Sequence, residues 1–175
     1  MKTVYIVEGG TVTAGNASPL NDGAAALLLA DEEGLRSLGR EPLARVSATG
    51  VSATDPQYFG LAPVEAVRRA LAKAGRDFGD LSVLELNEAF AAQVLGCLAE
   101  WPEFDPAVLN PQGGAIALGH PPPLSTPLER GDPHGASGAR LAGTVAHQLA
   151  RRGSGTGVAT LCIGVGQGLA LVLER

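Results

Sequence analysis

The chain has 175 residues, of which 45% are hydrophobic and 18% charged, so it can bury a sizeable core and its composition argues against disorder. Its net charge of −5 and its scattered basic residues argue against a nucleic-acid-binding surface. No long apolar run follows the amino terminus, so no signal peptide or membrane-spanning helix is expected. The two cysteines do not resemble a secreted disulfide framework, which makes a reducing cytoplasm the expected location.

Short runs of β-branched and other apolar residues alternate with segments of helical spacing. Strands are predicted at residues 11–14, 43–51, 83–86, 158–163 and 169–173. Helices of ordinary length are predicted between most of them. This alternation predicts an α/β layered domain.

Four helices are predicted from their capping residues and apolar spacing. The first is capped by Asn21 or Asp22 and ends at Gly39, and the second begins at Pro63 and ends at Gly75. The third should bury a stripe made of Ala89, Ala92, Leu95 and Leu98, with Cys97 also assigned to the core. The fourth covers residues 136–152 before Gly153, and its inward residues should be Leu141, Val145 and Leu149.

Three short stretches together offer the side chains of one active site. They are Asn87-Glu88-Ala89-Phe90, the glycine-bracketed run 113–121 that contains His120, and the run 162–168 that begins with Cys162. An amide, an imidazole, a thiol and a flexible series of backbone N–H groups suit acyl or carbanion chemistry beside a carbonyl.

Each of these candidates also has a structural interpretation. Asn87 lies between a strand and a helix, where Asn is a common N-cap, but a side-chain amide at a strand's carboxyl end can also hold a water or polarise a carbonyl. A lone histidine is usually structural, yet His120 lies on a loop whose glycines allow backbone to approach a ligand. A buried thiol is usually inert, whereas the glycines after Cys162 favour proton transfer. His134 and His147 have weaker contexts, and His147 is expected on a helix surface.

Five motifs, in order, closely resemble the C-terminal half of the thiolases, which are acyl-CoA acyltransferases that make or cleave 3-ketoacyl-CoA. They are residues 10–18 with 21–25, residues 87–90, the run ending at His120-Pro121, residues 135–140 and residues 162–164. The resemblance covers nearly the whole chain. It implies a mixed β-sheet flanked by helices, with residues 1–41 as the tail of the thiolase N-terminal domain and 42–175 as the C-terminal domain.

The resemblance also implies roles for single residues. His120 would activate the nucleophilic cysteine and contribute to an oxyanion hole, in which Asn87 would hold a water. Cys162 would act as the acid/base that moves a proton, and the Gly164 N–H would help to form a second oxyanion hole.

The implied substrate is an acyl-CoA, and no cofactor or metal is implied. Ser18 would hydrogen-bond the pantetheine arm of CoA, while Ala89 and Phe90 would line the pocket. The implied partners are further copies of the chain or an N-terminal thiolase half. A lone C-terminal half should need cover for the apolar stripes of its helices, among them Leu95 and Val145 with their neighbours.

Three features depart from the family pattern. The nucleophilic cysteine belongs to an N-terminal half that this chain lacks. Residues 122–134 contain four prolines and are interpreted as a loop insertion after His120-Pro121. Val165 replaces a glycine, which would strain the backbone if its φ were positive. We therefore expect an acyltransferase fragment or one chain of a split enzyme, inactive alone. The alternatives are a non-catalytic module that binds acyl-CoA or docks on a thiolase, and a degenerate gene product.

Overall fold

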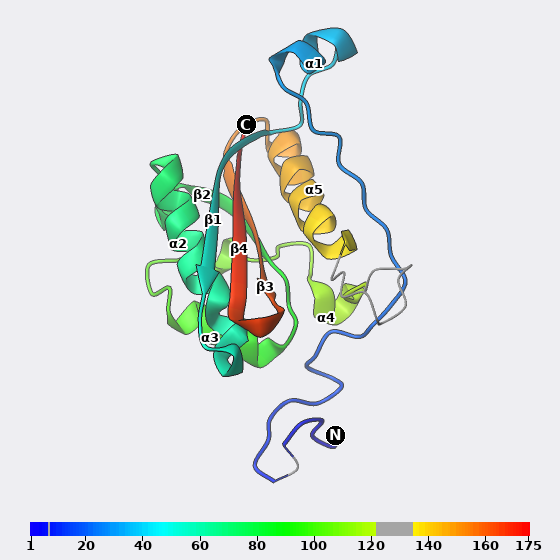
Figure 1. The fold of residues 1–175 in the computed structure, drawn as a ribbon, viewed down its shortest axis with the longest axis vertical. Coiled ribbons are helices and arrows are strands. Elements are labelled where there is room, and N and C mark those ends of the chain that lie inside the picture. Colours follow the sequence, from blue (N-terminus) through cyan, green and yellow to red (C-terminus); the bar gives the residue numbers. More distant parts are fainter. Residues whose placement is uncertain (7, 122–134) are drawn as a thin grey trace.

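A four-stranded mixed sheet forms the centre of the computed structural model, which describes residues 1–6, 8–121 and 135–175 (Figure 1). The sheet order is β1-β4-β3-β2, and the strands are β1 (Arg45–Ala53), β2 (Leu81–Leu86), β3 (Thr156–Ile163) and β4 (Gln167–Glu174). β4 runs antiparallel to both β1 and β3, whereas β2 and β3 are parallel. The predicted α/β class is confirmed, and the last four predicted strands all form.

Helices cover both faces of this sheet (Figure 1). Helix α2 (Ala62–Ala74) lies on one face, and its buried residues join Trp101 and Phe104 in the larger apolar core. Helix α5 (Gly135–Arg152) lies on the other face and forms a second core with residues of the sheet. Gly75 and Gly153 follow these helices with φ values of 64° and 85°, which confirms both as terminators.

The segment before β1 runs along the side of the domain as an arm, and two predictions within it are wrong (Figure 1). Residues 11–14 do not form a strand, because Thr13 makes only an isolated bridge with Thr3. The first helix does not begin at Asn21 or Asp22. Helix α1 (Glu32–Leu38) is capped by Asp31, whose Oδ1 accepts a hydrogen bond from Gly34 N at 2.8 Å, and it does end at Gly39.

The late start of α1 has a physical reason. The apolar run 24–30 is exposed, with Leu28 and Leu29 at 79% and 77% exposure, so no packing surface in the described residues stabilises a helix there. Helices gain most of their stability from such packing, and seven-residue helices are marginal without it.

The predicted apolar stripe of the third helix is only partly correct, since Leu98 packs against the larger core but Ala92 and Leu95 are exposed. Helix α3 (Ala91–Ala99) begins after Ala89, and Leu95 is 65% exposed. The helix instead buries Gln93 and Cys97, because Cys97 Sγ contacts the Gly60 carbonyl at 3.4 Å on the neighbouring segment. The assignment of Cys97 to the core is confirmed.

The inward residues of the fourth helix are as predicted, but they need no partner from another chain. Leu141, Val145 and Leu149 pack on Val83 of β2 and are at most 1% exposed. The expectation that the stripe of Val145 and Leu149 lacks cover is therefore wrong. No helix within residues 1–6, 8–121 and 135–175 is long and apolar enough to cross a membrane.

Candidate active site

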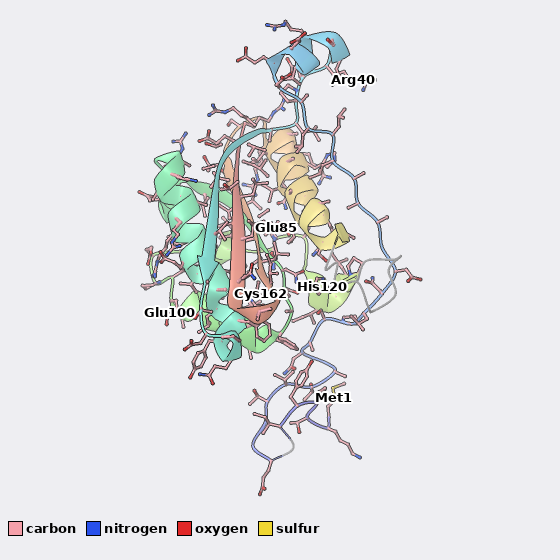
Figure 2. All side chains as sticks on the ribbon, in the orientation of Figure 1. Met1, Arg40, Glu85, Glu100, His120 and Cys162 are labelled. Carbon is pink, nitrogen blue, oxygen red and sulfur yellow. The ribbon has the colours of Figure 1, made fainter. Side chains whose placement is uncertain are left out.

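Asn87 and Cys162 come to the same end of the sheet because β2 and β3 are parallel. Leu86 pairs with Thr160 in register, and the Asn87 N–H donates to the Thr160 carbonyl at 3.0 Å. Cys162 lies two residues further along β3, and Figure 2 shows it at the end of the sheet that His120 also approaches. In α/β sheets, ligands collect at this carboxyl edge.

Asn87 is not an N-cap. Helix α3 starts four residues later, with Phe90 at its N-cap and no side-chain capping bond. The Asn87 residue is 1% exposed, and its Oδ1 accepts a hydrogen bond from Arg140 Nη2 at 3.5 Å. The capping interpretation is therefore wrong, and the amide remains available for a role at the site.

His120 is held from two sides. Its backbone N–H donates to the Pro19 carbonyl at 2.9 Å, and its Nδ1 lies 2.6 Å from Ser137 Oγ in the first turn of α5. Short helix α4 (Ala115–Leu118) precedes it, and Gly119 between them has φ 91°, a conformation that favours glycine. The arm and α5 thus fix both the backbone and the ring of His120.

Two polar residues that the sequence reasoning missed connect this loop to β2. The Asn110 amide replaces a neighbouring strand, because its Oδ1 accepts from Leu86 N and its Nδ2 donates to Leu86 O, both at 2.9 Å. Glu88 Oε1 accepts from Asn110 Nδ2 at 3.2 Å, and Glu88 Oε2 accepts from Ile116 N at 3.0 Å. Glu88 therefore caps α4. Its position directly after Asn87 was the one sequence signal that could have identified it.

The surroundings of Cys162 favour the protonated form of its thiol. Burial raises the pKa of Cys162 above its ordinary value, although the residue is partly exposed. At neutral pH the thiol is therefore protonated, as a proton donor should be. For the more deeply buried Cys97, burial raises the pKa to about 12.

The turn after Cys162 is strained at one position. Val165 has φ 66° and ψ 24°, so a β-branched residue occupies the left-handed region, which is the condition anticipated from the sequence. Gly164, just before it, is exposed at the mouth of the turn.

The three residues predicted to bind substrate lie close together, because Ser18 contacts Ala89 and Phe90 follows Ala89 in the sequence. The Ser18 N–H and Oγ both donate to the Ala89 carbonyl, at 3.1 and 3.3 Å. The Phe90 ring meets Tyr5 and Phe59 edge-on, with ring centroids 5.8 and 6.4 Å away. The arm thus lies directly against the Asn87-Glu88-Ala89-Phe90 motif. His147 is exposed on α5, as predicted. His134 and the predicted insertion 122–134 lie outside the described residues.

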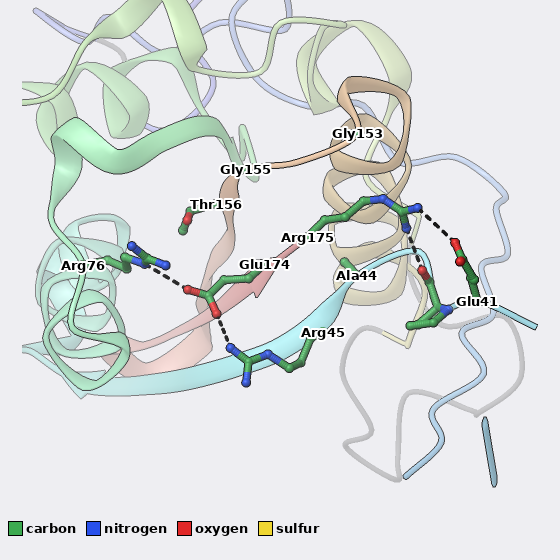
Figure 3. Close-up of a pocket in the computed structure, with 10 residues that line it drawn as sticks. Glu41, Ala44, Arg45, Arg76, Gly153, Gly155, Thr156, Glu174 and Arg175 are labelled. Carbon is green, nitrogen blue, oxygen red and sulfur yellow. Dashed lines mark hydrogen bonds and ion pairs between the residues drawn. The ribbon is translucent and has the colours of Figure 1, made fainter. Parts of the chain in front are cut away.

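A cavity of about 770 Å³ lies at the opposite end of the sheet and serves a different purpose (Figure 3). Glu174 accepts from Arg45 Nη2 at 2.6 Å and from Arg76 Nε at 2.9 Å across this cavity. Arg175 Nη1 donates to the Pro42 carbonyl at 2.7 Å. These contacts pair the charges with one another and fasten the segment before β1, so we assign the cavity no part in the site.

The sequence matches two family models. Residues 40–175 match the thiolase C-terminal domain, and residues 1–33 match the thiolase N-terminal domain. Among curated proteins, the chain is 50% identical over 168 residues to the 3-oxoadipyl-CoA/3-oxo-5,6-dehydrosuberyl-CoA thiolase of Escherichia coli, covering 95% of this chain and 39% of that protein. It is 48% identical over 166 residues to the acetyl-CoA acetyltransferase of Paracoccus denitrificans, again covering 95% of this chain and 39% of that protein.

Solved structures agree with these relatives. Human mitochondrial 3-ketoacyl-CoA thiolase, also solved in complex with CoA, superposes with a TM-score of 0.83 at 38% identity, over 100% of this chain and 41% of that chain. The Bacillus anthracis acetyl-CoA acetyltransferase superposes with a TM-score of 0.86 at 40% identity, over 99% of this chain and 41% of that chain. The chain thus spans about two fifths of the length of these relatives.

Proposed function

Because the chain belongs to the thiolase family, we propose that it provides the C-terminal part of a thiolase-type acyltransferase that acts on acyl-CoA. The reaction is acetyl transfer, as 3-ketoacyl-CoA thiolysis or condensation. The observation that carries the proposal is the placement of Asn87, His120 and Cys162, each on a different segment, around the carboxyl end of β2 and β3. No cofactor is part of the proposal, since the CoA thioester is itself the substrate.

His120 and Asn87 serve the acylation step in this proposal. His120, whose ring orientation is fixed by the contact of Nδ1 with Ser137, accepts the proton of a nucleophilic cysteine thiol on the thiolase N-terminal domain. The thiolate then attacks the carbonyl carbon of the substrate. His120 and a water held by Asn87 stabilise the oxygen that becomes negative.

Cys162 and Gly164 serve the proton-transfer step. When the bond between the acyl group and the acetyl-CoA carbanion breaks, the Cys162 thiol gives its proton to that carbanion. The Gly164 N–H stabilises the enolate oxygen. Cys162 then recovers a proton from the thiol of the incoming CoA, whose sulfur takes the acyl group from the nucleophilic cysteine, and the proton held by His120 returns to that cysteine. Because burial raises the pKa of Cys162, this thiol is protonated before the step, which supports the assignment.

Ser18, Ala89 and Phe90 form the substrate-binding part of the proposal. The hydrogen bonds from Ser18 to Ala89 support a single surface for the pantetheine arm, next to Asn87. The CoA complex of the human relative supports the choice of an acyl-CoA ligand.

We further propose that residues 1–41 belong with an N-terminal thiolase domain and that the chain works in an oligomer or with that domain. The match of residues 1–33 to the N-terminal domain supports this division. So do the exposed side chains of the arm, among them Leu20, Leu28 and Leu29, each at least 77% exposed. Both cysteines are free thiols, which supports a reducing cytoplasm.

A fusion protein tests the proposal. In the fusion, this chain replaces the region of the Paracoccus denitrificans relative that it matches. The remaining amino-terminal part of that relative would supply the nucleophile. With acetoacetyl-CoA and CoA, the fusion should turn over, and His120→Ala and Cys162→Ala should each abolish turnover. His147→Ala, on the exposed side of α5, is the matched control and should leave the rate unchanged.

The 175-residue chain alone should show neither turnover nor an acyl adduct by intact mass, because acyl transfer needs an activated nucleophile. Turnover by the chain alone, or an acetyl adduct on Cys162, would overturn the assigned roles. A fusion that folds and binds CoA without turnover would favour the alternative of a non-catalytic module. The strained turn at Val165 is the observation that keeps this alternative open.

A further inference from the structure

Helix α5 presents a polar stripe to the sheet beside its apolar one. Ser137, Arg140 and Gln148 lie along this stripe, and Ser137 and Gln148 are 0% and 5% exposed. Ser137 reaches His120, Arg140 reaches Asn87, and Gln148 reaches a buried carboxyl group on β2. One helix therefore contacts two groups of the proposed site and a third polar group behind them.

The buried carboxyl group is Glu85, which is 0% exposed. Its Oε1 accepts from Gln148 Nε2 at 2.7 Å, but its Oε2 has no hydrogen-bond partner among the described residues. A buried carboxylate without compensation costs several kcal/mol. Burial raises the pKa of Glu85, while the positive charge of Arg140 acts against that rise. The hydrogen bond from Gln148 also acts against the rise, and no ion pair or hydrogen bond joins Glu85 directly to Arg140, two residues that the structure describes.

Arg140 contacts the side chain of Asn87. Its Nη2 donates to Asn87 Oδ1 at 3.5 Å, and its Nε has no hydrogen-bond partner among the described residues. A guanidinium group has five N–H donors and no acceptor, and it stays charged at any ordinary pH. An amide that faces it must therefore present oxygen rather than nitrogen.

This constraint decides which end of the Asn87 amide faces the site. With Oδ1 toward α5, Nδ2 turns away from α5, so the site meets a hydrogen-bond donor. In the opposite amide orientation, Nδ2 would face the cation of Arg140, and Oδ1 instead of a donor would face the water that Asn87 is proposed to hold.

We propose that Arg140 is a positioning residue that selects the amide orientation of Asn87. The use of that orientation in catalysis rests on the proposed function. The orientation itself does not. The competing view is that Arg140 only neutralises Glu85 and has no influence on Asn87.

A double variant separates the two views. Arg140→Met alone would leave the Glu85 carboxylate buried and uncompensated, which could unfold the chain, so it is combined with Glu85→Gln. The amide that this substitution introduces is not charged and can still accept from Gln148. In the double variant, nothing remains to neutralise, so any change at Asn87 relative to Glu85→Gln alone reports positioning by Arg140.

The first measurement is the pair of side-chain Nδ2 proton signals of Asn87 in the ¹⁵N-labelled 175-residue chain. In the wild type and in Glu85→Gln, we expect two sharp, separate signals from one amide orientation. In Arg140→Met/Glu85→Gln, the two Asn87 signals should shift and broaden. In Arg140→Lys, they should lie closer to their wild-type positions and widths. Arg151→Met, in the exposed last turn of α5, is the control and should change nothing. Thermal unfolding checks that each variant is folded.

The second measurement is turnover by the fusion protein. Arg140→Met/Glu85→Gln should lower kcat about tenfold or more relative to Glu85→Gln, with KM changed less than kcat, because a misaligned donor acts on the reaction rather than on binding. Unchanged Asn87 signals in the folded double variant would overturn the proposal. If the Asn87 signals change in the double variant but the wild-type fusion is inactive, the proposed function is rejected and the positioning role of Arg140 is retained.

Discussion

Ser137 Oγ and His120 Nδ1 are 2.6 Å apart, although Ser137 belongs to the first turn of α5 and His120 to the loop after α4. Ser137 is fully buried. The contact fixes the imidazole ring about its Cβ–Cγ bond and commits one ring nitrogen to the protein. It is also a short bond, so its loss should be measurable in the stability of the whole domain.

We predict that Ser137→Ala lowers the free energy of unfolding by about 1–3 kcal/mol, because it leaves a ring nitrogen of His120 without this partner in a half-buried site. Urea unfolding measures the change. Ser154→Ala, in the exposed turn between α5 and β3, is the control and should change stability little. Equal effects of the two substitutions would mean that the Ser137 contact does not stabilise the domain.

Val165→Gly should stabilise the chain by up to about 1 kcal/mol. The left-handed conformation costs a non-glycine residue roughly 1–2 kcal/mol, and the greater freedom of unfolded glycine offsets part of the relief. Val165 is 77% exposed, so little packing is lost. The same substitution at Val51, which is 57% exposed within β1, should destabilise by roughly 1 kcal/mol. If Val165→Gly destabilised the chain, as Val51→Gly is expected to do, Val165 would not be strained.

Cys162 should react with iodoacetamide faster than Cys97. Cys162 is partly exposed, whereas burial of Cys97 raises its pKa to about 12 and keeps it protonated. Because burial raises both pKa values, the rate for Cys162 should still be increasing above pH 9. Peptide mapping after timed labelling gives both rates, and urea-unfolded chain should label both thiols equally. Equal rates in the folded chain would identify Cys162 as a packed core thiol.

The stability contributed by Glu174 should depend on pH. Hydrogen bonds from Arg76 and Arg45 hold the pKa of Glu174 below its ordinary value of 4.5. Its stabilisation is therefore fully present above pH 4.5 and is lost as the pH falls through the lowered folded-state pKa. Glu174→Gln should cost at most about 1 kcal/mol at pH 7, because both arginines are well exposed to solvent.

Urea unfolding of wild type and Glu174→Gln at pH 7 and pH 3 tests this dependence. The difference between them should shrink at pH 3, and also at pH 7 in 0.5 M salt, because salt screens exposed charges. Glu103→Gln, at an exposed position, should be neutral at pH 7. A difference that is the same at both pH values would exclude the ion pairs as its cause.

The sequence predicted those elements whose apolar residues are covered within the chain itself. Helix α5 buries the predicted face because Val145 and Leu149, which the helical spacing places on one side, pack on the sheet. The helix predicted from Asn21 or Asp22 does not form because Leu28 and Leu29, despite their helical spacing, are not covered by any of the described residues. Helix α3 was assigned a partly wrong face because its contact with Gly60 is tertiary, and local periodicity carries no record of it.

The same distinction applies to the candidate site. Asn87, His120 and Cys162 were found because each lies in a short local motif. Their supporting partners were missed because the contacts join residues far apart in sequence, 17 positions for Ser137 with His120 and 53 for Arg140 with Asn87. A polar pair at such a separation leaves no periodic pattern, so only the folded chain reveals it.

The Asn110 amide beside β2 makes the two edges of the sheet unequal. Asn110 N also donates to the Leu84 carbonyl at 2.9 Å, so this short segment already occupies hydrogen-bonding positions that an incoming strand would need. Along β1, at the other edge, no strand or bridge lies on the outer side within the described residues. Of the two edges, the β2 edge is therefore the one that the chain itself shields from pairing with a further strand.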